Sequence, residues 1–140
     1  MLTSQDTTIK NVMVIDDTFI DRFIVEQLIV KTGFAKNVIS KNGAKDALYY
    51  LELNAENPEM LPQIIFLDIR MPEMDGFGFL ERFELLPAFV KENCTIFMLS
   101  SSLNPDDLER ARTNKYVNRF LSKPLDREKL KDITMEFAIH

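Results

Sequence analysis

Apolar runs of strand length recur along the chain and alternate with segments that have helical periodicity. The strand-like runs are Val12–Ile15, Ile64–Leu67, Thr95–Leu99, Arg119–Leu121 and, more weakly, Asn37–Ser40. They are continuous rather than alternating in polarity, which is typical of parallel strands that are covered on both faces. The sequence therefore predicts buried parallel strands.

Each strand-like run is followed by a segment in which apolar residues recur every three or four positions, as on one face of a helix. In the first segment these residues are Ile20, Phe23, Ile24 and Leu28. The other segments lie near residues 44–51, 79–83, 105–111 and 126–137. We expect all of these stripes to pack against the core.

Capping residues indicate where some of the helices begin. Thr18 and Asp21 have the spacing of a capping box at the start of the first helix. Asn104 precedes Pro105, a residue type favoured at the first helical position, and so predicts the start of the fourth helix. Asp126 is the expected cap of the last helix. The repeated strand–helix order predicts a doubly wound α/β fold with helices on both faces of a parallel sheet.

Polar residues follow the predicted strands at one edge of this sheet. Asp16 and Asp17 follow the first strand, Asp68 the third, Ser100 the fourth and Lys123 the fifth. Ligands of doubly wound sheets bind beyond the carboxyl ends of the strands. We therefore expect three carboxylates, a hydroxyl group and an ammonium group to converge at one site.

Clustered carboxylates repel one another, and a divalent cation removes that conflict. Oxygen ligands suit Mg²⁺, so we expect a magnesium site at Asp16, Asp17, Asp68 and the backbone carbonyl of Arg70. A carboxylate held at a metal can accept a phosphoryl group, because phosphoryl transfer mainly requires positioning and charge neutralisation. Asp68 is the candidate acceptor, and the ammonium group of Lys123 would pair with a phosphoryl oxygen.

Composition limits the classes of function. The 140 residues suit one domain, and 17 basic against 22 acidic side chains give a net charge of −5. This balance argues against nucleic-acid and membrane-surface binding, which require concentrated positive charge. No apolar run approaches the roughly 18–20 residues that span a bilayer, and the N-terminal residues lack a signal-peptide core.

The cysteine and histidine content limits the expected compartment and the classes of catalytic site. The single cysteine, Cys94, excludes an internal disulfide bond and favours a reducing compartment, so we expect a cytoplasmic protein. The only histidine is His140, the last residue, which argues against a catalytic triad that uses histidine.

Four stretches of the chain resemble the receiver domain of two-component response regulators, of the stand-alone chemotaxis-regulator type. They read VMVIDDTFIDRFIVEQLI, IIFLDIRMPEMDGFGFL, FMLSSS and RFLSKPLDREKL. The resemblance covers about Asn11 to Phe137 and implies a flavodoxin-like five-stranded parallel sheet, order 2-1-3-4-5, with five helices. It implies one receiver domain over residues 1–140 with no output domain, and a cis bond between Lys123 and Pro124.

The same resemblance implies roles for the site residues. Asp68 would be the phosphoacceptor, Asp17 a direct Mg²⁺ ligand, Asp16 a supporting ligand through water, and the Arg70 carbonyl the remaining protein ligand. The phosphodonor would be a histidine kinase or a histidine phosphotransfer protein. The domain would catalyse its own phosphorylation and hydrolyse the product slowly, without turning over a metabolite.

In the family a switch follows phosphorylation. Ser100 matches the switch hydroxyl position and Phe120 the switch aromatic position. The hydroxyl moves toward the phosphoryl group and the ring follows, which repacks the face of the fourth helix, fifth strand and fifth helix where an unknown downstream protein would bind. The side chains at Arg70 and Ser102 would tune the lifetime of the phosphoryl group. Where many receivers carry a small Gly-Ala pair the chain reads NKYVN, and Asn114 is a candidate for left-handed backbone.

Two other functions are compatible with parts of this pattern. One is a Mg²⁺-dependent phosphatase with an aspartate nucleophile, but such enzymes usually place a second aspartate two residues on, where this chain has Arg70. The other is a receiver-like scaffold that is never phosphorylated, although the acid pair, Asp68, Ser100 and Lys123 are all present. A nucleotide-binding P-loop motif is absent from the sequence.

Overall fold

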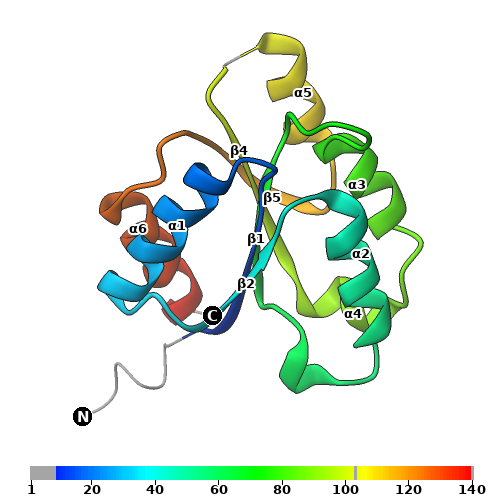
Figure 1. The fold of residues 1–140 in the computed structure, drawn as a ribbon, viewed down its shortest axis with the longest axis horizontal. Helices are drawn as coiled ribbons and strands as arrows, with labels where there is room; N and C mark the ends of the chain where they lie inside the picture. Colours follow the sequence, from blue (N-terminus) through cyan, green and yellow to red (C-terminus); the bar gives the residue numbers. More distant parts are fainter. Residues whose placement is uncertain (1–8, 103, 140) are drawn as a thin grey trace.

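One parallel sheet with the strand order β2-β1-β3-β4-β5 forms the centre of the computed structural model, which describes residues 9–102 and 104–139 (Figure 1). The strands are β1 Ile9–Ile15, β2 Ala35–Lys41, β3 Ile64–Asp68, β4 Thr95–Ser100 and β5 Val117–Ser122. The predicted order is confirmed, and every strand extends beyond its predicted apolar run. The expectations for the first eight residues and for His140 lie outside the described residues.

Helices cover both faces of the sheet. They are α1 Phe19–Thr32, α2 Ala44–Leu53, α3 Gly76–Phe83, α4 Ala88–Asn93, α5 Pro105–Thr113 and α6 Arg127–Ile139, with a 3₁₀ turn, η1, at Pro58–Met60. The prediction of five helices was therefore wrong, because α4 adds a sixth within the described residues. It spans 6 residues, too few to show helical periodicity. The predicted fourth and fifth helices correspond to α5 and α6.

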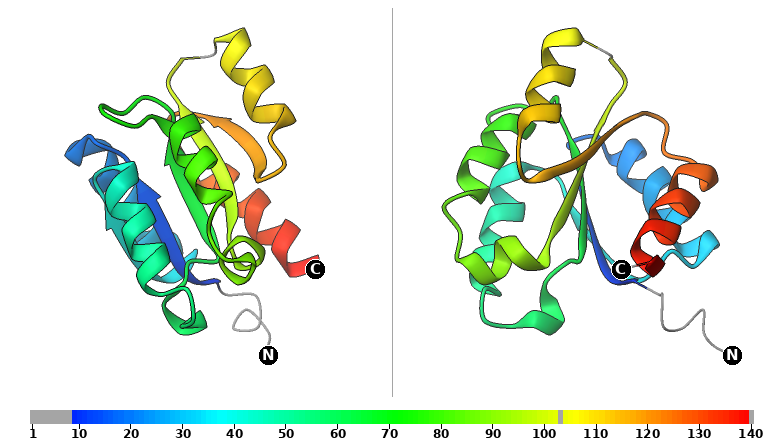
Figure 2. Two further views of the ribbon diagram at one scale, coloured as in Figure 1. Left: turned by 90° about the vertical axis from the view of Figure 1, so that its right-hand side faces the viewer. Right: turned by 180° about the vertical axis from the view of Figure 1, so that it is seen from behind.

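The two faces of the sheet have separate cores. Figures 1 and 2 show α1 and α6 on one face, and α2, α3 and α4 on the other. All five residues of β3 are buried, and they alternate between the two cores: Ile65 and Leu67 contact the α2–α3 side, whereas Ile64 and Phe66 contact the α1–α6 side. Burial on both faces explains why β3 reads as a continuous apolar run.

The predicted core face of α1 was wrong at three of its four positions, because Leu28 alone of the four predicted residues is partly buried against the core of the α1–α6 side. Val25 and Ile29 are its buried residues, whereas Ile20, Phe23 and Ile24 are 64%, 49% and 52% exposed. The helix is apolar on most of its circumference, so periodicity alone could not identify the side that faces the sheet.

The predicted helix ends have mixed outcomes. The Asn104 side chain accepts hydrogen bonds from the backbone N–H groups of the first turn of α5, and Asp126 accepts one from the Lys129 N–H at 2.9 Å, so both caps are confirmed. The capping box of α1 is not formed, because the Thr18 side chain makes no cap hydrogen bond. Asn114 has a φ of −84°, so the left-handed prediction was wrong there. The Lys123–Pro124 bond is cis, as expected.

Candidate functional site

Three aspartates meet at the carboxyl edge of the sheet, as the strand ends predicted. Each of Asp16, Asp17 and Asp68, here called the acidic cluster, offers a carboxylate oxygen, and these oxygens all lie within 4.8 Å of one another. They come together because β1 pairs with β3 so that Ile15 lies beside Leu67, and the chain continues from there into the acids. Asp16 and Asp68 are only 3% and 6% exposed, whereas Asp17 is exposed.

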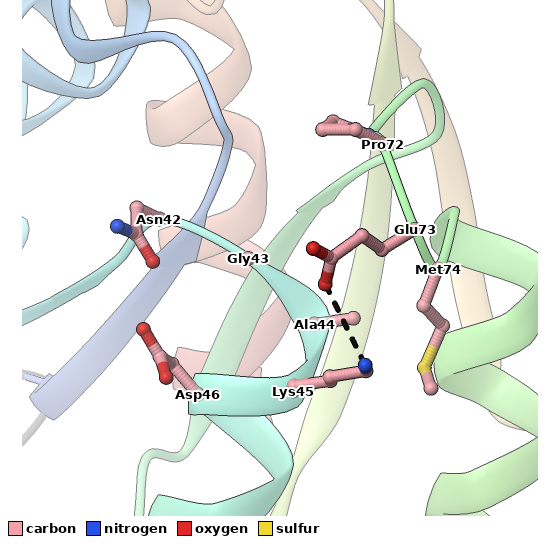
Figure 3. A pocket seen from close by; sticks show the side chains of 8 residues that line it. All are labelled: Asn42, Gly43, Ala44, Lys45, Asp46, Pro72, Glu73 and Met74. Carbon is pink, nitrogen blue, oxygen red and sulfur yellow. Dashed lines mark ion pairs between the residues drawn. The ribbon is translucent and has the colours of Figure 1, made fainter.

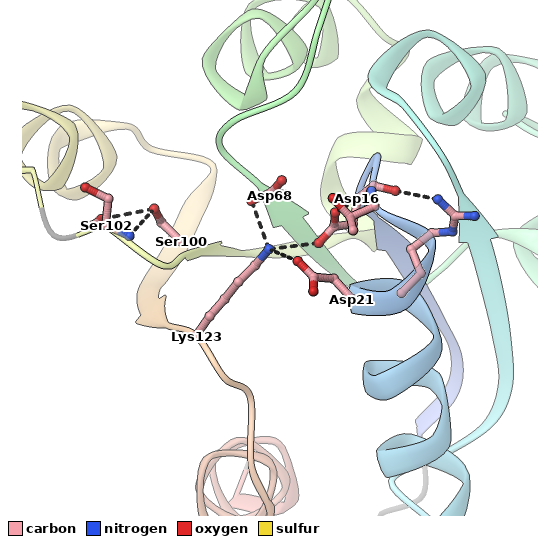
Figure 4. Close-up of polar contacts among 8 residues, drawn as sticks. Asp16, Asp21, Asp68, Ser100, Ser102 and Lys123 are labelled. Carbon is pink, nitrogen blue, oxygen red and sulfur yellow. Dashed lines mark hydrogen bonds and ion pairs between the residues drawn. The ribbon is translucent and has the colours of Figure 1, made fainter.

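Lys123 binds the cluster from the end of β5. Its Nζ atom lies 2.9 Å from Asp16 Oδ2, 3.1 Å from Asp21 Oδ2 and 3.3 Å from Asp68 Oδ1. Figure 4 shows the lysine side chain pointing between these carboxylates. Two of its three N–H donors form hydrogen bonds with Asp16 and Asp21, and the contact with Asp68 is an ion pair. Asp21 was expected only in a helix cap, and its membership of this site was not predicted from the sequence.

Burial and charge shift the proton affinities of the two central groups. The pKa of Asp68 rises from 3.8 to about 6, because burial and, to a smaller extent, the negative charge of Asp16 raise it more than Lys123 lowers it. Burial alone would lower the pKa of Lys123, but its hydrogen bond to Asp16 and the charge of Asp68 raise the pKa above its ordinary value. The cluster therefore holds more negative charge than the single lysine neutralises.

The oxygen atoms of Asp16 already have protein partners. Oδ1 accepts a hydrogen bond of 2.9 Å from the Thr18 N–H, and Oδ2 accepts the one from Lys123. The backbone carbonyl of Asp16 accepts a third, from Arg22 at 2.8 Å. Asp16 is therefore held in place by its surroundings, and the donor set of three carboxylates fits the oxygen preference of Mg²⁺.

The turn after Asp68 brings Gly76 close to the backbone of Asp68, the candidate phosphoacceptor. The Gly76 N–H donates to the Ile69 carbonyl at 2.8 Å. A Cβ atom on Gly76 would lie 2.9 Å from the Asp68 carbonyl oxygen and 2.9 Å from Met98 Cε. Glycine is thus required by close approach, and Asp75 caps the following helix by accepting a hydrogen bond from Gly78 N–H. The segment MPEMDG returns the chain tightly against the end of β3.

A shallow hollow of about 290 Å³ lies on the outer side of this turn, between the β2–α2 and β3–α3 connections (Figure 3). Asn42, Asp46 and Pro72 are among its lining residues. Glu73 forms part of the wall; it has a φ of 70°, and its carboxylate lies 3.6 Å from Lys45 Nζ. The members of the acidic cluster do not line this hollow.

Ser100 is almost fully buried, and its hydroxyl group faces its own loop. Its Oγ atom donates a hydrogen bond of 3.0 Å to the Ser102 carbonyl and accepts one of 3.1 Å from the Ser102 N–H (Figure 4). The Ser100 carbonyl accepts a hydrogen bond from the backbone N–H of Lys123 at 2.8 Å. Phe120 lies beside Met98 in the β4–β5 register and is half-buried against the α2–α3 core.

Arg70 forms an ion pair with a residue that is distant in the sequence. Its guanidinium group binds the carboxylate of Asp107 in the first turn of α5. The two residues are 37 positions apart. No local sequence pattern joins them, so only the fold could reveal this contact.

The sequence from Val12 to Thr134 matches the family model described as the response regulator receiver domain. The chain belongs to the response regulator receiver family. Receiver domains are signalling domains of two-component systems, they are phosphorylated by histidine kinases, and they bind Mg²⁺ in an acidic pocket. Within the described residues, none of the helices is long and apolar enough to cross a membrane.

Named relatives and solved structures agree with this assignment. The chain is 31% identical over 126 residues to the probable methanogenesis regulatory protein FilR2 of Methanothrix harundinacea, covering 86% of this chain and 76% of that protein. It is 29% identical to the two-component response regulator ORR1 of Oryza sativa, covering 84% of this chain and 50% of that protein. A two component response regulator from Cytophaga hutchinsonii superposes with a TM-score of 0.87 at 27% identity, covering 95% of this chain and 99% of that one.

Proposed function

We propose that Asp68 accepts a phosphoryl group from a phosphohistidine of a histidine kinase or a histidine phosphotransfer protein, and that the phosphorylated receiver signals through protein contacts. The observation that supports this most directly is the position of Asp68. It is a buried carboxylate at the end of a central strand, in contact with Lys123 and within a cluster that suits a divalent cation. Membership of the receiver family supports the same role.

In the transfer, a carboxylate oxygen of Asp68 attacks phosphorus, an O–P bond forms, and the N–P bond to the donor imidazole breaks. The leaving histidine keeps the electron pair of that bond. Asp68 must be ionised to attack, and a pKa of about 6 leaves most of it ionised above neutral pH. When bound by the acidic cluster and the Arg70 carbonyl, Mg²⁺ would supply positive charge for the phosphoryl oxygens.

Lys123 is positioned to stabilise the product. It contacts Asp68 Oδ1 at 3.3 Å, and this is the longest of its three carboxylate contacts. The N–H that now points to Asp68 would turn to a phosphoryl oxygen, while Asp16 and Asp21 keep the ammonium group in place. Slow hydrolysis of the aspartyl phosphate would then reset the domain.

The signal would pass through Ser100 and Phe120. To reach the phosphoryl group, the Ser100 hydroxyl must leave its two hydrogen bonds with Ser102. Phe120 is half-buried and would move into the space that opens beneath β5. The surface of α5, β5 and α6 would change as a result and bind the downstream protein.

Intact mass spectrometry tests the acceptor. With Mg²⁺ and acetyl phosphate the protein should gain one phosphoryl group, and Asp68→Asn should gain none because an amide is a poor nucleophile. Asp132→Asn, which removes an exposed carboxylate of α6, is the matched control and should be labelled like the parent. Labelling that persists in Asp68→Asn would disprove the assignment.

A further inference from the structure

Helix α5 has little apolar attachment to the rest of the protein. Its sequence, PDDLERART, is strongly polar, and its buried residues are Asp107 and Ala111. Figures 1 and 2 show it at the carboxyl edge of the sheet, beyond the ends of the strands. One of its two buried anchors is thus a carboxylate, which is unusual because a buried charge requires a partner.

Arg70 is that partner. Its guanidinium group binds Asp107, whose side chain is 10% exposed, whereas the side chain of Arg70 is 60% exposed. A second arginine contact joins α5 to α3, because the guanidinium group of Arg110 lies 4.0 Å from the centre of the Phe77 ring. The position of the first turn of α5 therefore depends on where the Arg70 side chain points.

Arg70 also follows the proposed phosphoacceptor closely. It lies two residues after Asp68, and Cα atoms two residues apart are separated by about 7 Å at most, a distance that an arginine side chain can span. A phosphoryl group adds negative charge and acceptor oxygens, and guanidinium groups bind phosphoryl oxygens in a bidentate manner. A phosphoryl group on Asp68 would therefore compete with Asp107 for Arg70.

We propose that Arg70 couples the state of Asp68 to α5: it binds Asp107 in the unphosphorylated protein and turns to the phosphoryl group after transfer. Asp107 then loses its cation while still buried, so the first turn of α5 moves outward until the carboxylate reaches water. This inference rests on the proposed function of Asp68. It describes a route to α5 separate from the route through Ser100 and Phe120.

Hydrogen exchange of the α5 amides, followed by NMR with Mg²⁺ present, tests the coupling. Without a phosphoryl group, Arg70→Ala and Asp107→Asn should each speed exchange at Leu108 to Thr113 by about tenfold, the size expected for the loss of one coupled pair. The double variant should exchange no faster than either single variant. Asp106→Asn, which removes an exposed carboxylate in the same turn, is the control and should match the parent within about twofold.

Beryllofluoride, which stands in for the phosphoryl group, provides the second half of the test. It should speed exchange in α5 of the parent and of Asp106→Asn, with little further change in Arg70→Ala or Asp107→Asn. The alanine variant keeps the Arg70 backbone carbonyl, so it should still bind beryllofluoride. If the parent does not bind beryllofluoride, the proposed function fails and the coupling fails with it. If the variants bind it and α5 responds as in the parent, or if the single variants exchange at the parent's rate beforehand, the coupling alone is wrong.

Discussion

Replacing the proposed phosphoacceptor should make the metal-free protein more stable at neutral pH. In the folded protein the pKa of Asp68 rises from 3.8 to about 6, chiefly through burial. One pKa unit corresponds to about 1.4 kcal/mol, so ionised Asp68 destabilises the fold by about 3 kcal/mol relative to its protonated form. Asp68→Asn removes this charge and keeps a side chain of similar size and shape. For a protein of this length, about 3 kcal/mol corresponds to roughly 10 °C in melting temperature.

The folded-state pKa of Asp68 determines how the free energy of unfolding changes with pH. Because the folded-state pKa lies above the unfolded-state value, the folded protein binds the Asp68 proton more tightly between pH 3.8 and about 6. The parent's free energy of unfolding should fall as pH rises through that window, and Asp68→Asn should lack this loss. The stability difference between variant and parent should therefore grow by about 2.4 kcal/mol between pH 4 and pH 7.

Urea denaturation without Mg²⁺, at several pH values from 4 to 8, measures this difference. Asp132→Asn on the exposed side of α6 is the control and should show no such growth. Adding Mg²⁺ should reduce the advantage of Asp68→Asn, because a cation that binds only the folded parent stabilises it. If the stability difference between Asp68→Asn and the parent stays constant across this pH range, burial and charge do not raise the pKa of Asp68 as argued.

Two further substitutions test the turn after Asp68 and the switch. Gly76→Ala should lower the free energy of unfolding by about 1–3 kcal/mol in urea denaturation, because its Cβ would overlap the Asp68 carbonyl. Gly43→Ala is the control and should lower the free energy of unfolding less, because its Cβ meets nothing within 4 Å. Equal stabilities of the two variants would contradict the packing argument. Ser100→Ala should still gain a phosphoryl group by intact mass, but the Phe120 ring signals should no longer respond to beryllofluoride; a response equal to the parent's would show that the hydroxyl group is not the trigger.

The sheet and the acidic cluster could be predicted because their signals are local. A strand that is buried on both faces reads as a continuous apolar run, as residues Ile64 to Leu67 of β3 do. A carboxylate directly after such a strand can only lie at the carboxyl edge, which places Asp16 and Asp68 without knowledge of the helices. The face of α1 could not be predicted in this way. Ile20 and Ile24 carry the same periodic signal as the buried Val25 and Ile29, and only contact with the sheet distinguishes them.

The ion pairs around the cluster could not be predicted for a different reason. Asp21 and Asp107 lie on helices, where a carboxylate in the first turn is normally explained by capping or by the helix dipole. Their lysine and arginine partners are 102 and 37 positions away, and the pairing depends on where each helix begins relative to the strand ends. Each of the two cations binds a carboxylate of a helix and is also close to Asp68. Lys123 contacts the Asp68 carboxylate, and Arg70 follows Asp68 by two residues in the sequence. A phosphoryl group on Asp68, as proposed, would add negative charge beside both cations. It would take the N–H of Lys123 that faces Asp68, while Asp21 of α1 keeps its contact, and it would compete with Asp107 of α5 for Arg70.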